Sequence, residues 1–255
     1  MKYYSAAALA TTLLMPTAFA EDNKQVHITA PDYWCPYACP ADQALKGFAI
    51  DIAIAAYAAV DIKVVYTNEP YDRALNDVKT GRLDGVAPTF KEEAPDFIFP
   101  THSISTTQYC FYTAQSDWQF SDMNSLNDVR FAATSGYAYS PKMDEYINEN
   151  KGTQVHLLKG DDVPNRMYQM LKNNRIDAIL DDTRLIDYML NTNEINGTLQ
   201  QAGCLDSKSY GYLALSPRFL RRSLFLAEQF DIGFTKIKTQ GKVAEILKQY
   251  GISTE

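Results

Sequence analysis

Two consecutive carboxylates, Asp181 and Asp182, follow a short apolar run in the second half of the chain. A carboxylate just past a buried strand can hold an ammonium group, because charge-assisted hydrogen bonds are about twice as strong as neutral ones. Asp182 also precedes a helix-like stretch, Arg184–Leu190, so it could instead cap that helix. Both roles can hold through different oxygens. Asp181 is expected to point to the opposite side.

Aromatic side chains in the first half could complete a site of this kind. Trp34 and Tyr37 lie in a short segment with two cysteines, and Tyr71 begins a helix-like stretch. A ring face is a flat apolar platform that attracts a cation by a few tenths to about 2 kcal/mol. Packing in the core is the alternative for each ring. It is the stronger alternative for Tyr71, since turn-forming and cysteine residues flank Trp34.

Catalytic chemistry has little support in the sequence. There is no Gly-x-Ser-x-Gly motif, no phosphate-binding loop and no histidine placed near a serine or cysteine nucleophile. Asp181 with Asp182, and Glu92 with Glu93, are adjacent only in sequence, which places neighbours on different sides. We therefore expect no enzyme activity and no cofactor. An acid–base role for Asp182 alone is the enzymatic alternative.

The first twenty residues are predicted to be a signal peptide. They combine Lys2, the apolar stretch Ala6–Met15 and a small-x-small cleavage site ending at Ala20. No later segment approaches the roughly 18 to 20 apolar residues that a membrane helix needs. The net charge of -7 argues against nucleic acid as a partner. We expect a soluble exported protein, periplasmic if the source has two membranes.

Four cysteines in an exported chain can form two disulfides. Three pairings are possible, and spacing favours Cys35 with Cys39 and Cys110 with Cys204. The second bridge would close a large loop and could add about 4 to 5 kcal/mol. A metal site is not expected, because Cys-x3-Cys has no partner pair and the three histidines are scattered.

One phrase occurs twice, as KTGRLDGV at Lys79–Val86 and as KNNRIDAI at Lys172–Ile179. Each copy leads from a helix-like stretch into an apolar run, and each half reads β-α-β-α-β. Such halves predict two parallel sheets with a cleft between them, where ligands bind beyond the carboxyl ends of the strands. The alternative is that any α/β protein repeats such phrases. The predicted elements before the two copies are strands 26–30 and 62–66 with helices 48–60 and 71–79, then strands 129–134 and 155–158 with helices 141–148 and 163–172.

The fold class that we predict is α/β, with two Rossmann-like lobes joined by a two-strand hinge. The first lobe takes residues 21–112 and 214–255, and the second takes residues 113–213. The chain should cross between lobes near Phe111–Ala114 and Leu213–Ser216. The tail, Phe219–Tyr250, should form two helices that break near Thr239–Gly241 and pack on the first lobe.

Several phrases in this order resemble the bacterial extracellular solute-binding proteins of family 3. They are GFAIDI at Gly47–Ile52, GRLD at Gly81–Asp84, the Asp96-Phe97 run before Pro100, and RIDA at Arg175–Ala178 with Asp182 shortly after. The resemblance covers nearly the whole mature chain, and segment 32–39 resembles a cysteine-bearing branch. It implies a type II periplasmic binding protein fold that closes on a ligand by hinge motion and serves amino acid-type ABC importers.

The resemblance also assigns roles to single residues. Trp34 and Tyr37 would supply aromatic walls, Tyr71 would lie at the cleft, and Asp182 would receive the ammonium group of the ligand. In the second lobe, Gly136 and Tyr137 occupy the place of a Gly-Thr or Gly-Ser step, which in the family directs N–H groups from a helix N-terminus. There Tyr137 replaces a small hydroxyl residue.

The chain departs from the family where amino acid binders carry a threonine and an arginine for the ligand carboxylate. Segment 87–96 has no arginine, and Thr89, Phe90 and Lys91 are the candidates that remain. A lysine lacks the planar fork that grips a carboxylate. Arg73 could substitute if it reached the cleft, but at i+2 on a helix it should face away from Tyr71. We therefore predict a small polar ligand that is amine-bearing or amino acid-like, and the missing arginine favours a cationic or amine-bearing one. The expected partners are this small molecule and either ABC importer subunits or a membrane sensor; a monomer is expected, and a dehydratase-like enzyme is the remote alternative.

Overall fold

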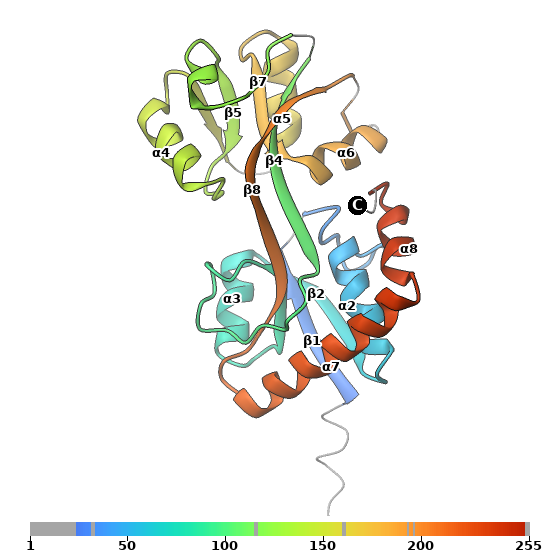
Figure 1. The fold of residues 1–255 in the computed structure, drawn as a ribbon. Coiled ribbons are helices and arrows are strands. Elements are labelled where there is room, and N and C mark those ends of the chain that lie inside the picture. The colour runs from blue at the N-terminus through green and yellow to red at the C-terminus, as the bar shows by residue number, and fades with distance from the viewer. Residues whose placement is uncertain are drawn as a thin grey trace, which may run out of the picture.

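The computed structural model describes residues 24–31, 34–114, 117–159, 162–192, 194–195 and 197–252. The predicted signal peptide lies outside the described residues, as do two residues of the cysteine segment, Asp32 and Tyr33. Across the described ranges, no helix has the length and apolar character needed to cross a membrane. The described chain forms two α/β lobes linked by two long strands (Figure 1).

The first lobe is built on three parallel strands. β1 (Gln25–Ala30) lies between β2 (Lys63–Asn68) and β3 (Gly85–Thr89) and pairs in parallel with both. Helices α2 (Phe48–Ala58) and α3 (Tyr71–Lys79) make the crossovers that parallel pairing requires. The C-terminal helices α7 (Leu220–Thr239) and α8 (Lys242–Gln249) return to this lobe, where their apolar residues share a core with those of α2.

The second lobe repeats this plan. β5 (Phe131–Thr134) pairs in parallel with β6 (Val155–Leu158) and with β7 (Ala178–Asp182). Its helices are the short 3₁₀ helix η2 (Met123–Leu126), α4 (Pro141–Asn150), α5 (Val163–Lys172) and α6 (Thr183–Asn191). The predicted β-α-β-α-β order of both halves is therefore confirmed, and so is the break between the two tail helices.

Two antiparallel strands join the lobes. β8 (Gln200–Leu215) pairs with β3 at one end and with β4 (Ser105–Thr113) along the rest, giving the strand order β2-β1-β3-β8-β4-β7-β5-β6. β4 pairs with β7 only from Tyr109 onward, so the linking stretches are residues 105–108 and 208–211. The predicted crossing points lie a few residues beyond these, because Phe111 packs in a core of the second lobe and Leu213 in a core of the first. The predicted lobe boundaries at 112/113 and 213/214 stay predictions.

Each sheet has an apolar core on both faces. In the first lobe, one core holds Ile28, Phe48 and Phe230, and the other forms between α3 and β3. In the second lobe, Phe131 and α4 belong to one core, and α5 and α6 belong to the other. The two lobes are thus separately packed bodies, which is the condition for rigid lobes that move about a hinge.

The repeated motif has the same structural role in both lobes. Asp84 Oδ2 accepts the N–H of His27 at 2.8 Å, and Asp177 Oδ2 accepts the N–H of Arg130 at 2.9 Å. The N–H groups of the two aspartates in turn donate to the carbonyls of His27 and Arg130. In each lobe the motif aspartate therefore ties the start of the third strand of the repeat to the start of its first strand.

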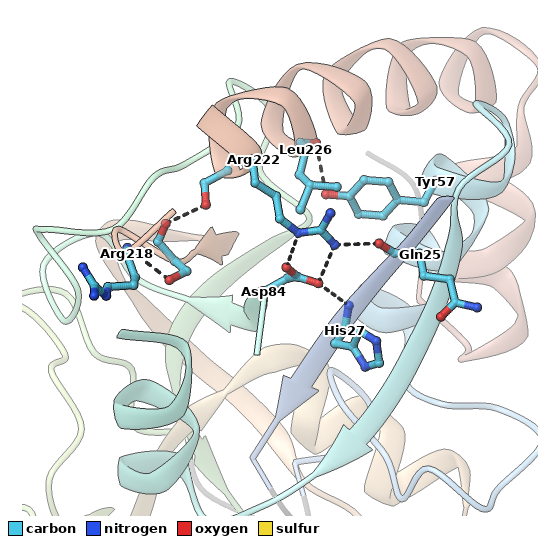
Figure 2. Close-up of polar contacts among 9 residues, drawn as sticks. Gln25, His27, Tyr57, Asp84, Arg218, Arg222 and Leu226 are labelled. Carbon is cyan, nitrogen blue, oxygen red and sulfur yellow. Dashed lines mark hydrogen bonds and ion pairs between the residues drawn. The ribbon is translucent and has the colours of Figure 1, made fainter. Parts of the chain in front are cut away.

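Arginine side chains neutralise both of these aspartates. In the first lobe, Arg222 of α7 donates from Nε to Asp84 Oδ1 at 2.6 Å and from Nη2 to the Gln25 carbonyl at 2.8 Å (Figure 2). In the second lobe, the arginine that donates its backbone N–H to Asp177, Arg130, also contacts this aspartate through its guanidinium group. The repeat thus stabilises the fold, and the ligand chemistry has to come from other residues.

Candidate functional site

Asp182 is the last residue of β7 and the N-cap of α6. Its Oδ1 accepts the N–H groups of Arg184 and Leu185, each at 3.1 Å, and the hydroxyl of Tyr37 at 2.7 Å. The residue is only 4% exposed, and its Oδ2 is buried without a hydrogen-bond partner. The predicted capping role is confirmed, and the second oxygen is buried and has no hydrogen-bond partner among the described residues.

Asp181 is a second buried carboxylate beside Asp182. Its Oδ1 accepts the N–H of Asp182 at 2.8 Å, and its Oδ2 is also buried without a partner. Burial raises the pKa of Asp181 to about 7, and the charge of Asp182 adds to this. Burial likewise raises the pKa of Asp182 to about 6, against the opposing effects of the Tyr37 hydrogen bond and the Arg184 charge. Burial of charge without compensation is costly, so a cation placed here would be strongly favoured.

The cysteine segment brings Tyr37 to Asp182 from the other lobe. The predicted Cys35–Cys39 disulfide is confirmed, and reciprocal hydrogen bonds between the backbones of Trp34 and Ala38 close the turn. The Tyr37 ring is fully buried, with Trp34 stacked at 5.0 Å and Phe48 at 4.8 Å between ring centroids. Only its hydroxyl reaches the site, which leaves half-buried Trp34 as the ring of this segment that a ligand can contact.

Tyr71, Thr89 and Phe90 lie around the carboxyl end of β3. The Tyr71 hydroxyl donates to Glu93 Oε2 at 2.5 Å, and the Phe90 N–H reaches the same oxygen at 3.3 Å. Thr89 is the last residue of β3 and is buried. The sequence analysis considered Glu93 only as the neighbour of Glu92. Here it is the carboxylate that anchors Tyr71.

Lys91, the cation expected to replace the missing arginine, is engaged with aromatic rings. Its Nζ lies 4.3 Å from the centroid of the Tyr212 ring and 5.8 Å from that of Phe99. These two rings pack edge to face at 5.9 Å. A cation–π contact of this kind holds the ammonium group by about 0.5–2 kcal/mol, which a ligand carboxylate would have to exceed.

Gly136 and Tyr137 lie in the turn that follows β5. Gly136 has φ +89° and faces open space, while α4 begins only at Pro141 with Ser140 as its N-cap. The expectation that Gly136 sits at a helix N-terminus is therefore wrong, because the turn continues for several residues before the helix starts. Any N–H groups presented here belong to the turn.

Three tyrosines gather beside the two aspartates. Ring centroids of Tyr109 and Tyr139 are 4.6 Å apart, and Tyr137 lies 6.2 Å from each. Burial raises the pKa of the Tyr137 hydroxyl, and the charges of Asp181, Asp182 and Glu93 raise it further. Carboxylates of both lobes thus affect the pKa of Tyr137. Tyr109 pairs directly with Asp182 across β4 and β7. Recognition of β4 in the sequence would have pointed to it.

The assembled site is acidic and aromatic. It can hold a cation by charge and by ring faces, and it offers no activated nucleophile. In the described ranges, no group of three or more histidine, cysteine, aspartate or glutamate side chains is arranged to hold a metal ion. The residues that define the site are Asp181, Asp182, Glu93, Trp34, Tyr37, Tyr71, Tyr109, Tyr137 and Tyr139.

Comparison with known proteins identifies the family. The model of the bacterial extracellular solute-binding proteins, family 3, matches residues 26–253, so the chain belongs to this family. The predicted family and the predicted type II periplasmic binding protein fold are both confirmed. No curated protein sequence matched the chain.

Solved structures share the fold at low sequence identity. An ancestral arginine-binding protein bound to arginine is 17% identical, with a TM-score of 0.66 over 89% of this chain and 98% of that one. The periplasmic VFT2 domain of Bordetella pertussis BvgS is 15% identical, with a TM-score of 0.69 over 91% and 96%. An ancestral amino acid-binding protein, a precursor of cyclohexadienyl dehydratase, is 14% identical, with a TM-score of 0.67 over 91% and 97%. The family and its structural neighbours are mainly binding proteins.

Proposed function

We propose that this chain is a periplasmic receptor that captures a small amine-bearing cation between its lobes and delivers it to an ABC importer. One observation carries the proposal. Asp182 Oδ1 is saturated by three donors, whereas Oδ2 of the same buried carboxylate has no partner. An ammonium group supplies the missing donor and the missing charge together.

A cation is favoured over a zwitterion by the surroundings of Asp182. Asp181, Asp182 and Glu93 act together on the Tyr137 hydroxyl, whereas the charge of Arg184 offsets only part of the effect of burial on Asp182. Lys91 lies over Tyr212, and the guanidinium group of Arg184 lies 5.3 Å from the centroid of the Phe48 ring. The carboxylate of an amino acid would therefore meet little positive charge at this site. An amine without a carboxylate would meet the negative charge that binds it.

Capture requires the lobes to close, and we place the hinge in the two linking stretches. Residues 105–108 and 208–211 are the part of the β4–β8 ribbon that pairs with neither β7 nor β3. The Tyr37 hydroxyl bridges this region, because it contacts Asp182 of the second lobe and the Thr106 carbonyl of the ribbon. Movement of the lobes would change the surroundings of Trp34, which stacks on Tyr37.

The proposal is tested by binding of defined probes to the mature protein. We expect putrescine, and more weakly arginine, to change Trp34 fluorescence and to release heat in titration calorimetry, and glutamate to do neither. D182N keeps an acceptor for Tyr37 and for the helix cap but loses the charge, so it should bind putrescine at least tenfold more weakly. E149Q removes a carboxylate charge from an exposed position of α4 in the same lobe and should bind as the parent does.

Tighter binding of glutamate than of either cation would refute the amine proposal. Mass spectrometry of solute that co-purifies with the native protein would identify the natural ligand and would also detect chemical turnover. The alternative partner is a membrane sensor, which the similarity to the BvgS periplasmic domain supports. Co-purification of the loaded receptor with its membrane partner separates importer from sensor.

A further inference from the structure

A cavity of about 620 Å³ lies against the β4–β8 ribbon, on the face away from Tyr37. Side chains alternate across a strand, and here the alternation separates two environments. Thr107 Oγ1 donates to the Tyr37 hydroxyl on the ligand side, whereas Thr106 and Gln108 line the cavity. On β8, Ser207 contacts the Tyr139 carbonyl, whereas Lys208 lines the cavity. We refer to the cavity lined by Thr106, Gln108 and Lys208 as the rear cavity.

The walls of the rear cavity come from both lobes. Thr183, Arg184 and Asp187 of α6 line it from the second lobe, and Val243, Ala244 and Leu247 of α8 line it from the first. These two helices lie on the same side of the linking strands (Figure 1). The volume falls within the usual range of small-molecule sites, so the cavity can accommodate a metabolite-sized ligand.

The charge of the lining is opposite to that of the protein. The chain as a whole carries a net charge of -7, yet three cations line this cavity, Arg184, Lys208 and Lys238, against one carboxylate, Asp187. Amide and hydroxyl donors of Gln108, Gln201, Thr106 and Thr183 surround them. Cations gathered on one concave surface focus a positive potential there. The acidic, aromatic site around Asp182 has the reverse character.

From this arrangement we infer that the rear cavity is a second binding site, which takes a small dianion such as an inorganic oxyanion or a dicarboxylate. The dianion contacts both lobes and so biases their relative arrangement. Arg184 connects the two sites, because its side chain lines the rear cavity while its backbone N–H donates to Oδ1 of the N-cap residue Asp182. Binding of an anion behind the hinge and of a cation in front of it are therefore energetically coupled.

The test uses the mature protein without added cationic solute. Thermal unfolding is followed during titration with sodium sulfate, with disodium succinate, and with sodium chloride at matched ionic strength. We expect a saturable rise in Tm of a few degrees with at least one dianion and none with chloride. Preference for sulfate indicates an oxyanion site, and preference for succinate indicates a dicarboxylate site.

Variants locate the effect. K208Q/K238Q should lose the dianion response, and the single variant K238Q, at an exposed position, should weaken it at least threefold if the double variant folds poorly. K248Q removes a lysine from the exposed face of α8, outside the cavity, and should respond as the parent does. Because no cationic solute is present, the dianion response is measured independently of amine binding, which separates this test from that of the amine site. An equal response of K238Q, K248Q and the parent, or no dianion response in the parent, would overturn the inference.

Discussion

At the scale of single residues, one carboxylate serves both the fold and the site. Asp182 Oδ1 caps α6 and accepts the Tyr37 hydroxyl, and Oδ2 is left buried and unpaired. Leaving a buried acceptor unsatisfied costs about 1–3 kcal/mol or more, and a ligand that supplies the donor recovers that energy on binding. The site is thus held in a high-energy state until a ligand compensates it.

The neighbouring carboxylate gives a prediction with a defined sign. Burial raises the pKa of Asp181 to about 7, so the folded protein holds a proton that the unfolded chain has already lost above pH 4. The contribution of the protonated Asp181 carboxyl to the free energy of unfolding is fully present below about pH 4 and is lost as the pH rises through about 7. D181N cannot ionise and keeps an acceptor for the Asp182 N–H. Its advantage over the parent in free energy of unfolding should therefore grow from pH 4 to about 1–4 kcal/mol at pH 8.

Urea unfolding at several pH values checks this, with D177N as a control of opposite sign. Arg130 lowers the pKa of Asp177, so loss of that charge should destabilise the protein at neutral pH. A D181N advantage that stays constant from pH 4 to pH 8 would show that the ionisation of Asp181 does not affect stability.

At the scale of elements, the sequence predicted best where one face of an element is apolar. Helices 71–79 and 163–172 and strand 155–158 have the predicted bounds, because a helical or strand periodicity is evident in each. The extent of β8 was not predicted, because the sequence indicated only a hinge strand crossing near Leu213–Ser216. Residues 206–209 of β8 are polar and are exposed or half-buried, so no hydrophobic pattern marks this part of the strand.

Prediction of the site was limited in a different way. Asp182, Trp34 and Tyr137 were predicted from local sequence and from the family resemblance, whereas Tyr109 and Tyr139 depend on contacts between distant segments. Tyr139 reaches the site through a hydrogen bond from the Thr134 N–H to its hydroxyl, a contact set by the path of the turn after β5. The position of Tyr139 follows from tertiary packing and carries no signal in a single sequence, whereas Tyr109 could have been found by recognising β4.

The start of α2 gives a prediction at this scale. Gly47 has φ +97°, and a Cβ there would lie 2.4 Å from the Tyr37 carbonyl oxygen, which is backbone and cannot move aside cheaply. We expect G47A to cost about 3 kcal/mol or more, from left-handed strain and overlap together, and to weaken cation binding by displacing Tyr37. G136A is the matched control, because Gly136 has φ +89° but faces open space. It should cost only about 1–2 kcal/mol.

Chemical unfolding of the two variants measures this difference directly. A cost for G47A no greater than that for G136A would mean that the cysteine segment can shift away from α2. The segment would then not be the rigid support that holds the Tyr37 hydroxyl against Asp182.

At the scale of the whole molecule, the β4–β8 ribbon joins the two lobes. The candidate ligand site lies on one face of this ribbon, and the rear cavity lies on the other. The Asp84 and Asp177 ties connect strands within each lobe, whereas the stretches 105–108 and 208–211 pair with each other, so we propose that lobe movement concentrates in these two stretches. The Cys110–Cys204 disulfide, which is confirmed, joins β4 to β8 where the ribbon enters the second lobe. The proposed hinge therefore lies next to a covalent crosslink between β4 and β8.

The two disulfides differ in how much they should stabilise the molecule. Cys110 and Cys204 are 94 residues apart, whereas Cys35 and Cys39 are 4 apart. Since a crosslink restricts the unfolded chain more when its loop is longer, we expect C110S/C204S to cost about 4–5 kcal/mol and C35S/C39S about 2 kcal/mol. Equilibrium unfolding of both double variants in urea checks the order. Equal costs, or a larger cost for C35S/C39S, would show that the short bridge acts through the native cysteine segment, by holding Tyr37 in place, more than through the unfolded chain.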